Sequence, residues 1–242
     1  MPEHESNKKE LPAIVRIPKN IIQFIIFLVI QILLVPVFII AIVLLFYKVL
    51  YTSRKLGVSS TATEPLYKRW QYHYFKIRED EVTVKLVKAL PIASHYGVMG
   101  VMAAMLIANR LCGFTPSAIS RVPEPGKENL VTTVLSRTAF FDRLLEKYLP
   151  SGDQVVLLGA GFDSWSFKFC QGKTVKVFEL NEARTQQLKI EALEKAGLEH
   201  DWITFVPVDF EQEAWIDNLV ENGFDPSKKT FFLWEGVTHY LT

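Results

Sequence analysis

A short apolar run that opens into two glycines places the strongest constraint on the fold of this chain. Residues 154–163 read QVVLLGAGFD, and the branched side chains of Val155–Leu158 predict a strand buried on both faces, which is typical of a parallel sheet. Gly159 and Gly161 allow a sharp turn and a close approach of the backbone to a ligand, which a Cβ atom would block. Ligands bind beyond the carboxyl ends of the strands in open α/β sheets, so we expect the functional site at this loop.

The glycine pair alone is weakly specific, and a plain turn between a strand and a helix is the competing interpretation. A dinucleotide-binding motif would carry a third glycine where this chain has Ser164. Glu179, however, follows a second apolar run at 174–178, eighteen residues after Gly161. An acid at that place can hydrogen-bond ribose hydroxyls. The sequence therefore favours a nucleoside-containing ligand.

Strand and helix patterns alternate through the rest of the chain. Expected strands at 203–207 and 230–234 lead into Asp209 and Glu235, and helical patterns separate the strands. Such alternation predicts βαβ units and a parallel sheet. Together with Glu179, these acids would stand at the carboxyl ends of three successive strands, beside the glycine loop.

A long apolar segment precedes this α/β region. Residues 21–46 carry no charge, and none occurs between Lys19 and Lys48. As one helix they would measure roughly 39 Å, against about 30 Å for the hydrocarbon core of a bilayer. A signal peptide has a shorter apolar core, and a buried helix this apolar would need a larger protein around it. We expect a single transmembrane helix at 21–46, kinked at Pro36, after a flexible polar tail at 1–20.

The region 47–127 is expected to form a linker and a helical cap. Within its most apolar part, 92–114, only 14 uncharged positions separate His95 from Arg110, fewer than a membrane span needs. We therefore favour a capping helix over a second span. Basic residues are nearly balanced on the two sides of 21–46, so the positive-inside rule leaves the orientation open.

Charge and composition exclude other classes of site. A net charge of +1 argues against general nucleic-acid binding. Cys112, Cys170 and the five histidines show no metal-ligand spacing, so we expect neither a metal site nor a disulfide framework.

Arg137 is the one cation on an apolar helical stripe. The spacing of apolar residues predicts a helix over 128–148 that ends before Pro150, and a guanidinium on its buried side needs a partner. Either the arginine stem covers the core while its head reaches water, or the cation holds a ligand carboxylate. The pattern leaves both open.

Five short segments follow one another in a distinctive order: SRTAFFD at 136–142, LLGAGFD at 157–163, VFELN at 177–181, VPVDF at 206–210 and LWEGVTHYL at 233–241. In order and spacing they resemble the leucine carboxyl methyltransferase-like family, and within it an O-methyltransferase branch. Its members are class I S-adenosylmethionine-dependent methyltransferases. The resemblance implies a Rossmann-like parallel sheet and an S-adenosylmethionine-binding domain over residues 128–242.

The resemblance also implies roles for residues at the methionine end of this cofactor. Arg137 would hold the methionine carboxylate, and Glu235 would contact the aminoacyl end. Gly159 and Gly161 would let the loop lie against the same part of the cofactor.

Other residues would bind the adenosine end. Asn181 stands where the family has an aspartate on the ribose hydroxyls, which leaves Glu179 as the nearest carboxylate. Asp209 and Phe210 would hold the adenine. Trp165 stands where the family often has arginine. We expect no catalytic base, because a carboxylate methyl acceptor is already ionised at pH 7. A lone histidine is more often structural, so we interpret His239 near the rim as a structural residue.

The family sheet has seven strands, whereas only four, in the order 3-2-1-4, are visible here. We therefore expect an incomplete domain: a fragment, a truncated product, or a protein whose sheet is completed by another chain. The expected function is a single-pass, membrane-anchored O-methyltransferase with its catalytic domain in the cytosol, acting on a small or lipidic acceptor. An inactive scaffold protein at a membrane is the alternative, and Ser164 disfavours a nicotinamide-dependent reductase.

Overall fold

The computed structural model describes the chain apart from residues 1–12, 117–121, 125, 130–131, 212–214 and 238–242. The N-terminal half is helical: α1 (Ala13–Leu33), α2 (Val35–Phe46), the π-helix η1 (Tyr47–Thr52), α3 (Ser53–Leu56), the 3₁₀ turn η2 (Ser60–Ala62), α4 (Thr63–Tyr74), α5 (Glu81–Ala89) and α6 (His95–Cys112). Helix and strand then alternate: α8 (Thr133–Tyr148), η3 (Leu149–Ser151), β1 (Gln154–Leu158), η4 (Ser166–Cys170), β2 (Lys176–Asn181), α9 (Ala183–Lys195), β3 (Ile203–Pro207), α10 (Trp215–Glu221) and β4 (Thr230–Trp234).

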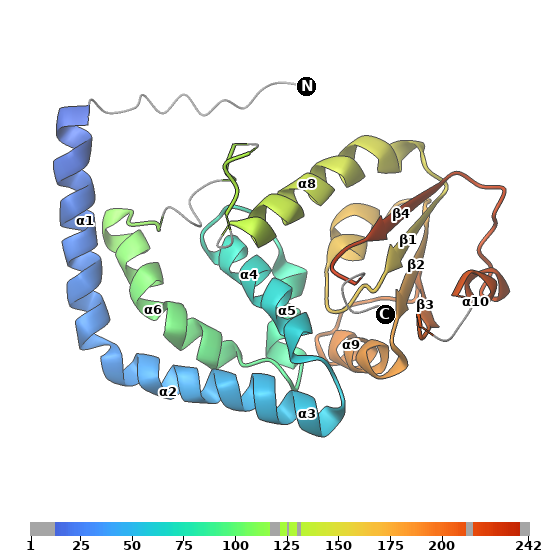
Figure 1. Ribbon diagram of the computed structural model, residues 1–242, viewed down its shortest axis with the longest axis horizontal. Coiled ribbons are helices and arrows are strands. Elements are labelled where there is room, and N and C mark those ends of the chain that lie inside the picture. The colour runs from blue at the N-terminus through green and yellow to red at the C-terminus, as the bar shows by residue number, and fades with distance from the viewer. Residues whose placement is uncertain (1–12, 117–121, 125, 130–131, 212–214, 238–242) are drawn as a thin grey trace.

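The four strands form one parallel sheet in the order β3-β2-β1-β4, which confirms the predicted order. Side chains alternate between its two faces, as a period of two requires. One face, with Val155 and Leu157, packs in the main core together with side chains from α4, α5, α6, α8 and α9. The other face, with Val156 and Leu158, packs against α10. Figure 1 shows the sheet at one end of the molecule and α1, α2 and α6 at the other. This α/β architecture fits the expected Rossmann-like fold.

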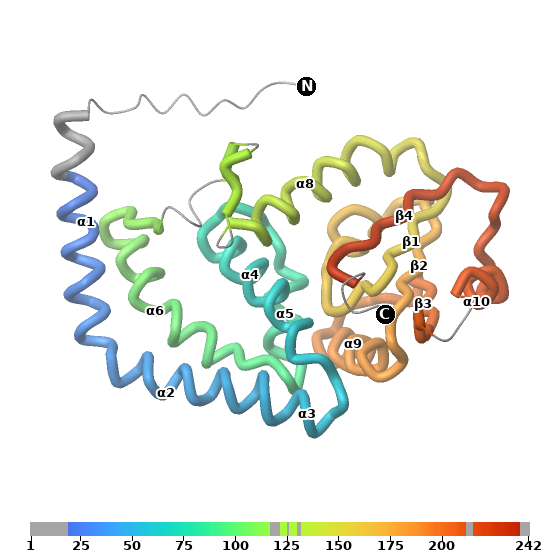
Figure 2. Tube along the Cα trace, viewed as in Figure 1, coloured from blue at the N-terminus to red at the C-terminus, as the bar shows by residue number. Residues whose placement is uncertain are grey.

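The apolar segment is two helices rather than the single kinked helix expected at 21–46. The chain breaks at Leu34 (φ −95°, ψ 8°), and Figure 2 shows the trace turning sharply there. Pro36 explains the position of the break, because proline lacks an N–H and its ring meets the carbonyl of the residue four before it. Among the described residues, one helix is long and apolar enough to cross a membrane, Val35–Leu56. Helix α1 also begins at Ala13, inside the expected polar tail.

Helix α6 lies in the corner between α1 and α2 (Figures 1 and 2). A Cβ atom on Gly100 would come within 2.6 Å of the Ala41 Cβ, so glycine permits close packing of α6 on α2. At the far end of α6, the Gln23 Nε2 donates a hydrogen bond to the Cys112 carbonyl. Met102 of the same helix is buried in the main core. Helix α6 therefore joins the apolar helices to the α/β domain.

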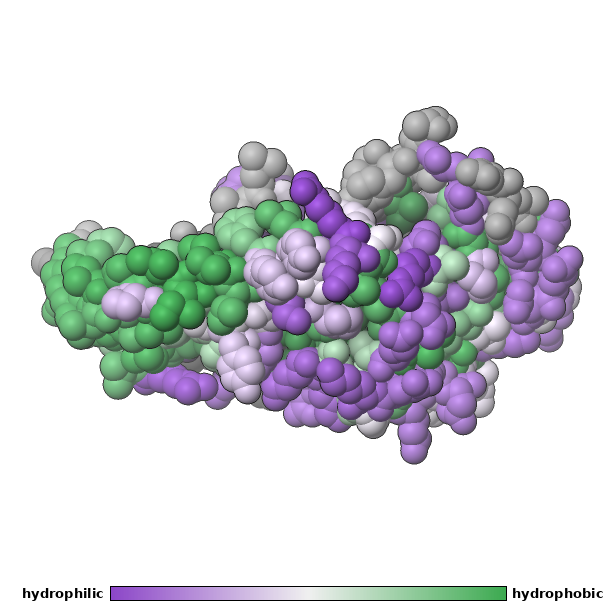
Figure 3. Space-filling model, turned by 90° about the horizontal axis from the view of Figure 1, so that it is seen from below, coloured by the Kyte–Doolittle hydropathy of each residue, from purple (hydrophilic) through white to green (hydrophobic). Residues whose placement is uncertain are grey.

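The outer faces of α1 and α2 are exposed and apolar. Leu33, Ile40 and Val43 are 72%, 61% and 61% exposed, and Figure 3 shows a continuous hydrophobic surface over this end of the molecule. Water-exposed patches of this kind mark interaction sites.

A buried polar network fastens the N-terminal helices to the sheet domain. Arg78 is ion-paired with Asp80 and with Asp142 of α8, at 2.7 Å from its Nε to the Asp142 Oδ2. The Ser164 hydroxyl donates to Asp80 at 2.6 Å, and the Trp165 indole donates to Asp142 at 2.8 Å. The network thus fixes the segment that follows the glycine loop.

Candidate functional site

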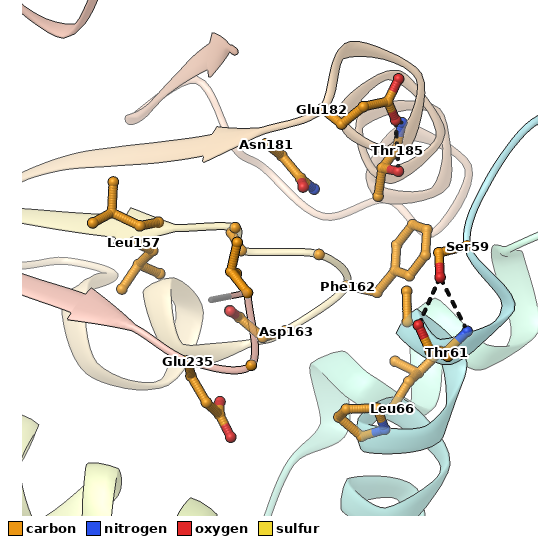
Figure 4. A pocket seen from close by; sticks show the side chains of 18 of the residues that line it. Ser59, Thr61, Leu66, Leu157, Phe162, Asp163, Asn181, Glu182, Thr185 and Glu235 are labelled. Carbon is orange, nitrogen blue, oxygen red and sulfur yellow. Dashed lines mark hydrogen bonds between the residues drawn. The ribbon is translucent and has the colours of Figure 1, made fainter. Parts of the chain in front are cut away.

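A cavity of about 750 Å³ lies at the carboxyl ends of the strands, within the usual size of a small-molecule site. Its walls are the glycine loop, the ends of β2, β3 and β4, part of α8, and the segment from Gly57 to Arg69. Figure 4 shows Leu157 and Glu235 on the side of the sheet, and Ser59 and Thr61 on the side of the N-terminal helices. The cavity therefore lies where the two halves of the chain meet.

The glycine loop requires both of its glycines. Gly159 and Gly161 have φ values of 66° and 50°, in the left-handed region that other residues avoid. A Cβ atom on Gly159 would lie 2.1 Å from the Cγ2 of Val237. The loop is held by backbone hydrogen bonds from Gly159 and Ala160 to the Leu180 carbonyl, so its backbone lies directly against the cavity.

Asn181 offers an unused hydrogen-bond donor to the cavity. It is the last residue of β2, and Figure 4 shows its side chain beside Glu182 and Thr185. The Asn181 Nδ2 is buried without a hydrogen-bond partner, which is costly unless a ligand satisfies it. The neighbouring Glu182 caps α9 by accepting from the backbone N–H groups of Arg184 and Thr185, each at 3.0 Å.

Opposite charges meet on the other side of the cavity. Arg137 is ion-paired with Glu235, and the Arg69 Nη2 lies 3.6 Å from the Glu235 Oε2. The Arg69 guanidinium stacks 4.1 Å over the Trp165 ring. Burial raises the pKa of Glu235, and the charges of Arg69 and Arg137 offset part of that rise. Arg137 thus lines the cavity with its head paired to a carboxylate of the protein itself, and its role toward a ligand carboxylate stays a prediction.

Asp209 and Phe210 line the cavity beyond β3. The Asp209 Oδ1 accepts a hydrogen bond from the backbone N–H of Glu211 at 3.0 Å. The Phe210 ring lies 6.1 Å from the Trp234 ring. This corner of the cavity combines an aromatic surface with a carboxylate.

The sequence model of the leucine carboxyl methyltransferase family matches residues 92–242, which is more than half of the chain. This chain belongs to the leucine carboxyl methyltransferase family. The match begins just before α6 and thus earlier than the residues 128–242 that carry the motifs.

Curated relatives in the family bear the names of S-adenosyl-L-methionine-dependent methyltransferases. The chain is 37% identical over 116 residues to the "Putative S-adenosyl-L-methionine-dependent methyltransferase YktD" of Bacillus subtilis, covering 47% of this chain and 38% of that protein. It is 36% identical over 137 residues to the similarly named FRAAL3718 of Frankia alni, covering 53% of this chain and 47% of that protein. A relative from Mycobacteroides abscessus is 36% identical over 108 residues, 44% of this chain and 36% of that protein. The chain thus spans less than half the length of these relatives. Their names and the family imply S-adenosylmethionine as the cofactor.

Seven of the eight residues expected to bind the cofactor line the cavity: Arg137, Gly159, Gly161, Asn181, Asp209, Phe210 and Glu235. Glu179 does not. It is 1% exposed, with its carboxylate 2.6 Å from the Lys189 Nζ and accepting from the Ser166 hydroxyl. The reason is that β2 continues to Asn181, so Glu179 lies in the body of the strand rather than at its end.

Arg69 and the 57–66 segment are cavity residues that the sequence did not reveal. The family motifs begin at Ser136, and Arg69 lies before residue 92, where the family match begins. Asp163 also lines the cavity, and its place at the end of the LLGAGFD motif could have identified it. His239, near the rim in the sequence interpretation, lies outside the described residues.

Proposed function

We propose that this chain is an S-adenosylmethionine-dependent O-methyltransferase, anchored at a membrane, that methylates a carboxyl or hydroxyl group of a small or lipidic acceptor. The observation that carries the proposal is the donor set around the cavity. Arg137 and Glu235 place a cation and an anion side by side, the complement of an amino-acid zwitterion. The unpartnered Asn181 Nδ2 and the backbone of the glycine loop lie on the adjoining walls.

These residues fit the cofactor at both of its ends. Arg137 would bind the methionine carboxylate and Glu235 the ammonium, while Asn181 would bind the ribose hydroxyls. Asp209 and Phe210 would hold the adenine, with the ring as the stacking surface. When bound, S-adenosylmethionine supplies a methyl group activated by a sulfonium.

The contribution of the protein is then mainly positional. A carboxylate acceptor is ionised at pH 7 and needs no general base. Holding the acceptor oxygen in line with the methyl carbon can lower a barrier by up to about 7–11 kcal/mol in the best cases. The buried walls of Trp165 and Leu157 would keep competing water away from the reacting atoms.

Membrane anchoring is supported by the exposed apolar faces of α1 and α2 and by the length of the Val35–Leu56 helix. Because S-adenosylmethionine is made in the cytosol, we propose that residues 52–242 face the cytosol. The outer edge of β4 is unpaired among the described residues, with Phe232 44% exposed. This edge suits pairing with a further strand.

Transfer of a labelled methyl group tests the activity. The full chain in phosphatidylcholine vesicles is incubated with methyl-labelled cofactor and a panel of carboxylic acids and alcohols. We expect a labelled product, and release of the label by mild base would identify a methyl ester rather than an ether. An inactive S-adenosylmethionine-binding protein is the second candidate, favoured by the replacement of two family side chains at Asn181 and Trp165. It predicts cofactor binding with no transfer to any acceptor.

A further inference from the structure

A second, open groove adjoins the candidate site. It has a volume of about 290 Å³ and runs between the apolar α2–η1 helix and the start of α4. The groove and the main cavity share two lining residues, Thr61 and Glu64. A ligand that fills both would therefore have one part in the groove and another part in the cavity.

The groove is lined by apolar and polar side chains, the polar ones being Ser60, Thr61, Thr63, Glu64, Lys68 and Gln71. Leu45 and Val49, four residues apart and so on one helix face, line it together with the buried ring of Tyr67. The Tyr67 hydroxyl accepts a hydrogen bond from the Ser94 N–H, which fixes its ring beside the groove. Thr61 and Glu64 lie at the junction with the cavity.

In a chain anchored by this helix, the groove would lie near the level of the lipid head groups. Tyr47 and Tyr51 stack 5.1 Å apart on the outside of the same helix and are 55% and 57% exposed. Lys48 lies between them and Arg54 follows. Exposed tyrosines next to basic residues at the end of an apolar helix are typical of the membrane–water interface. Leu45 and Val49 are at the same height along the helix.

We propose that the methyl acceptor is an amphiphile with one long aliphatic chain, which lies in the Leu45–Val49 groove while its oxygen-bearing head reaches the main cavity past Thr61 and Glu64. The inference rests on the proposed function and narrows its acceptor class. It explains why the segment 57–66, which directly follows the apolar helix, forms a wall of the cavity. The acceptor would leave the bilayer at the interface and enter the site without crossing water.

Photo-crosslinking tests where the chain of the acceptor lies, independently of methyl transfer. The full chain in phosphatidylcholine vesicles is irradiated with a diazirine-labelled C16 carboxylic acid or its C4 counterpart. We expect C16 adducts on the peptides that contain residues 45–49 and 60–71, and little labelling by the C4 acid. Substitution Val49→Trp should fill the groove and reduce C16 labelling about tenfold, as loss of most of the apolar contact implies. Val43→Trp, on the exposed side of the same helix, should leave it unchanged.

Cofactor titration of the same variants separates this inference from the proposed function. Val49→Trp should bind S-adenosylmethionine as the parent protein does, while its preference for palmitate over butyrate, measured as kcat/KM, collapses. Three results would each overturn the inference. They are adducts mapped outside the groove, equal labelling of the Val49→Trp and parent proteins, and no labelling of the groove by either probe because a protein segment fills it. Absent cofactor binding with groove labelling retained would instead refute the proposed function.

Discussion

At the scale of single residues, Asn181 is the side chain whose change should improve the site. Its buried Nδ2 has no partner, and the family resemblance implies an aspartate at this position. We expect Asn181→Asp to bind S-adenosylmethionine about tenfold more tightly, because hydrogen bonds to a charged group are roughly twice as strong as neutral ones. Isothermal titration measures this. The exposed Asn222→Asp is the matched control and should leave the affinity unchanged; equal affinities for both variants would remove Asn181 from the site.

Gly159 allows backbone strain to be separated from site geometry. Gly159→Ala and Gly172→Ala both place a Cβ at positive φ, 66° and 74°, which costs about 1–2 kcal/mol in each case. Only at Gly159 does the new atom meet another residue, Val237. We expect both variants to lose thermal stability, Gly159→Ala more because of the contact with Val237, and only Gly159→Ala to bind the cofactor at least about tenfold more weakly. A similar affinity loss in Gly172→Ala would show that strain, not the loop, is responsible.

At the scale of elements, the junction between the N-terminal helices and the sheet domain depends on Asp142. The pKa of Asp142 is lowered: burial would raise it, but the hydrogen bond and charge of Arg78, aided by Lys168, outweigh burial. We expect Asp142→Asn to lower the free energy of unfolding by about 2 kcal/mol at pH 7, because the buried Arg78 then keeps only Asp80 as a carboxylate partner. The exposed Asp217→Asn should change it by less than about 0.5 kcal/mol.

The same carboxylate predicts a pH dependence. Because the folded-state pKa lies below the ordinary value of 3.8, the stabilisation is present above that value and is lost as the pH falls through the folded-state pKa. In micelles, the contribution of Asp142 to the melting temperature of the parent protein should therefore stay constant between pH 7 and 5. It should decline below about pH 4. In Asp142→Asn this part of the decline should be absent, and an unchanged acid profile would contradict the assignment.

The elements also show what the sequence could and could not predict. The four strands followed from the alternation of apolar runs, and their order from the family resemblance. Asn181, Asp209 and Glu235 reach the cavity because each lies at or just beyond a strand end. Glu179 was placed wrongly because the apolar pattern does not reveal that β2 extends two residues further. Arg69 could not be found, because its contact with Glu235 joins residues that no local period relates.

At the scale of the whole molecule, the exposed apolar helices predict stable membrane association and one orientation. The full chain should float with phosphatidylcholine vesicles and resist extraction by 1 M salt, since apolar burial does not depend on ionic screening. Protease added to the cytosolic side of intact membranes should cleave within 52–242. Release of the protein by salt, or protection of that region, would contradict the anchored arrangement with a cytosolic domain.

Cofactor titration of three proteins tests most directly whether the cavity binds S-adenosylmethionine. We expect the parent chain to bind it, and Gly161→Val and Asp209→Ala to bind at least about tenfold more weakly, because the first strains a φ of 50° and the second removes the carboxylate beyond β3. Circular dichroism should show that both variants remain folded. Undiminished binding by both folded variants would contradict the assignment of this cavity.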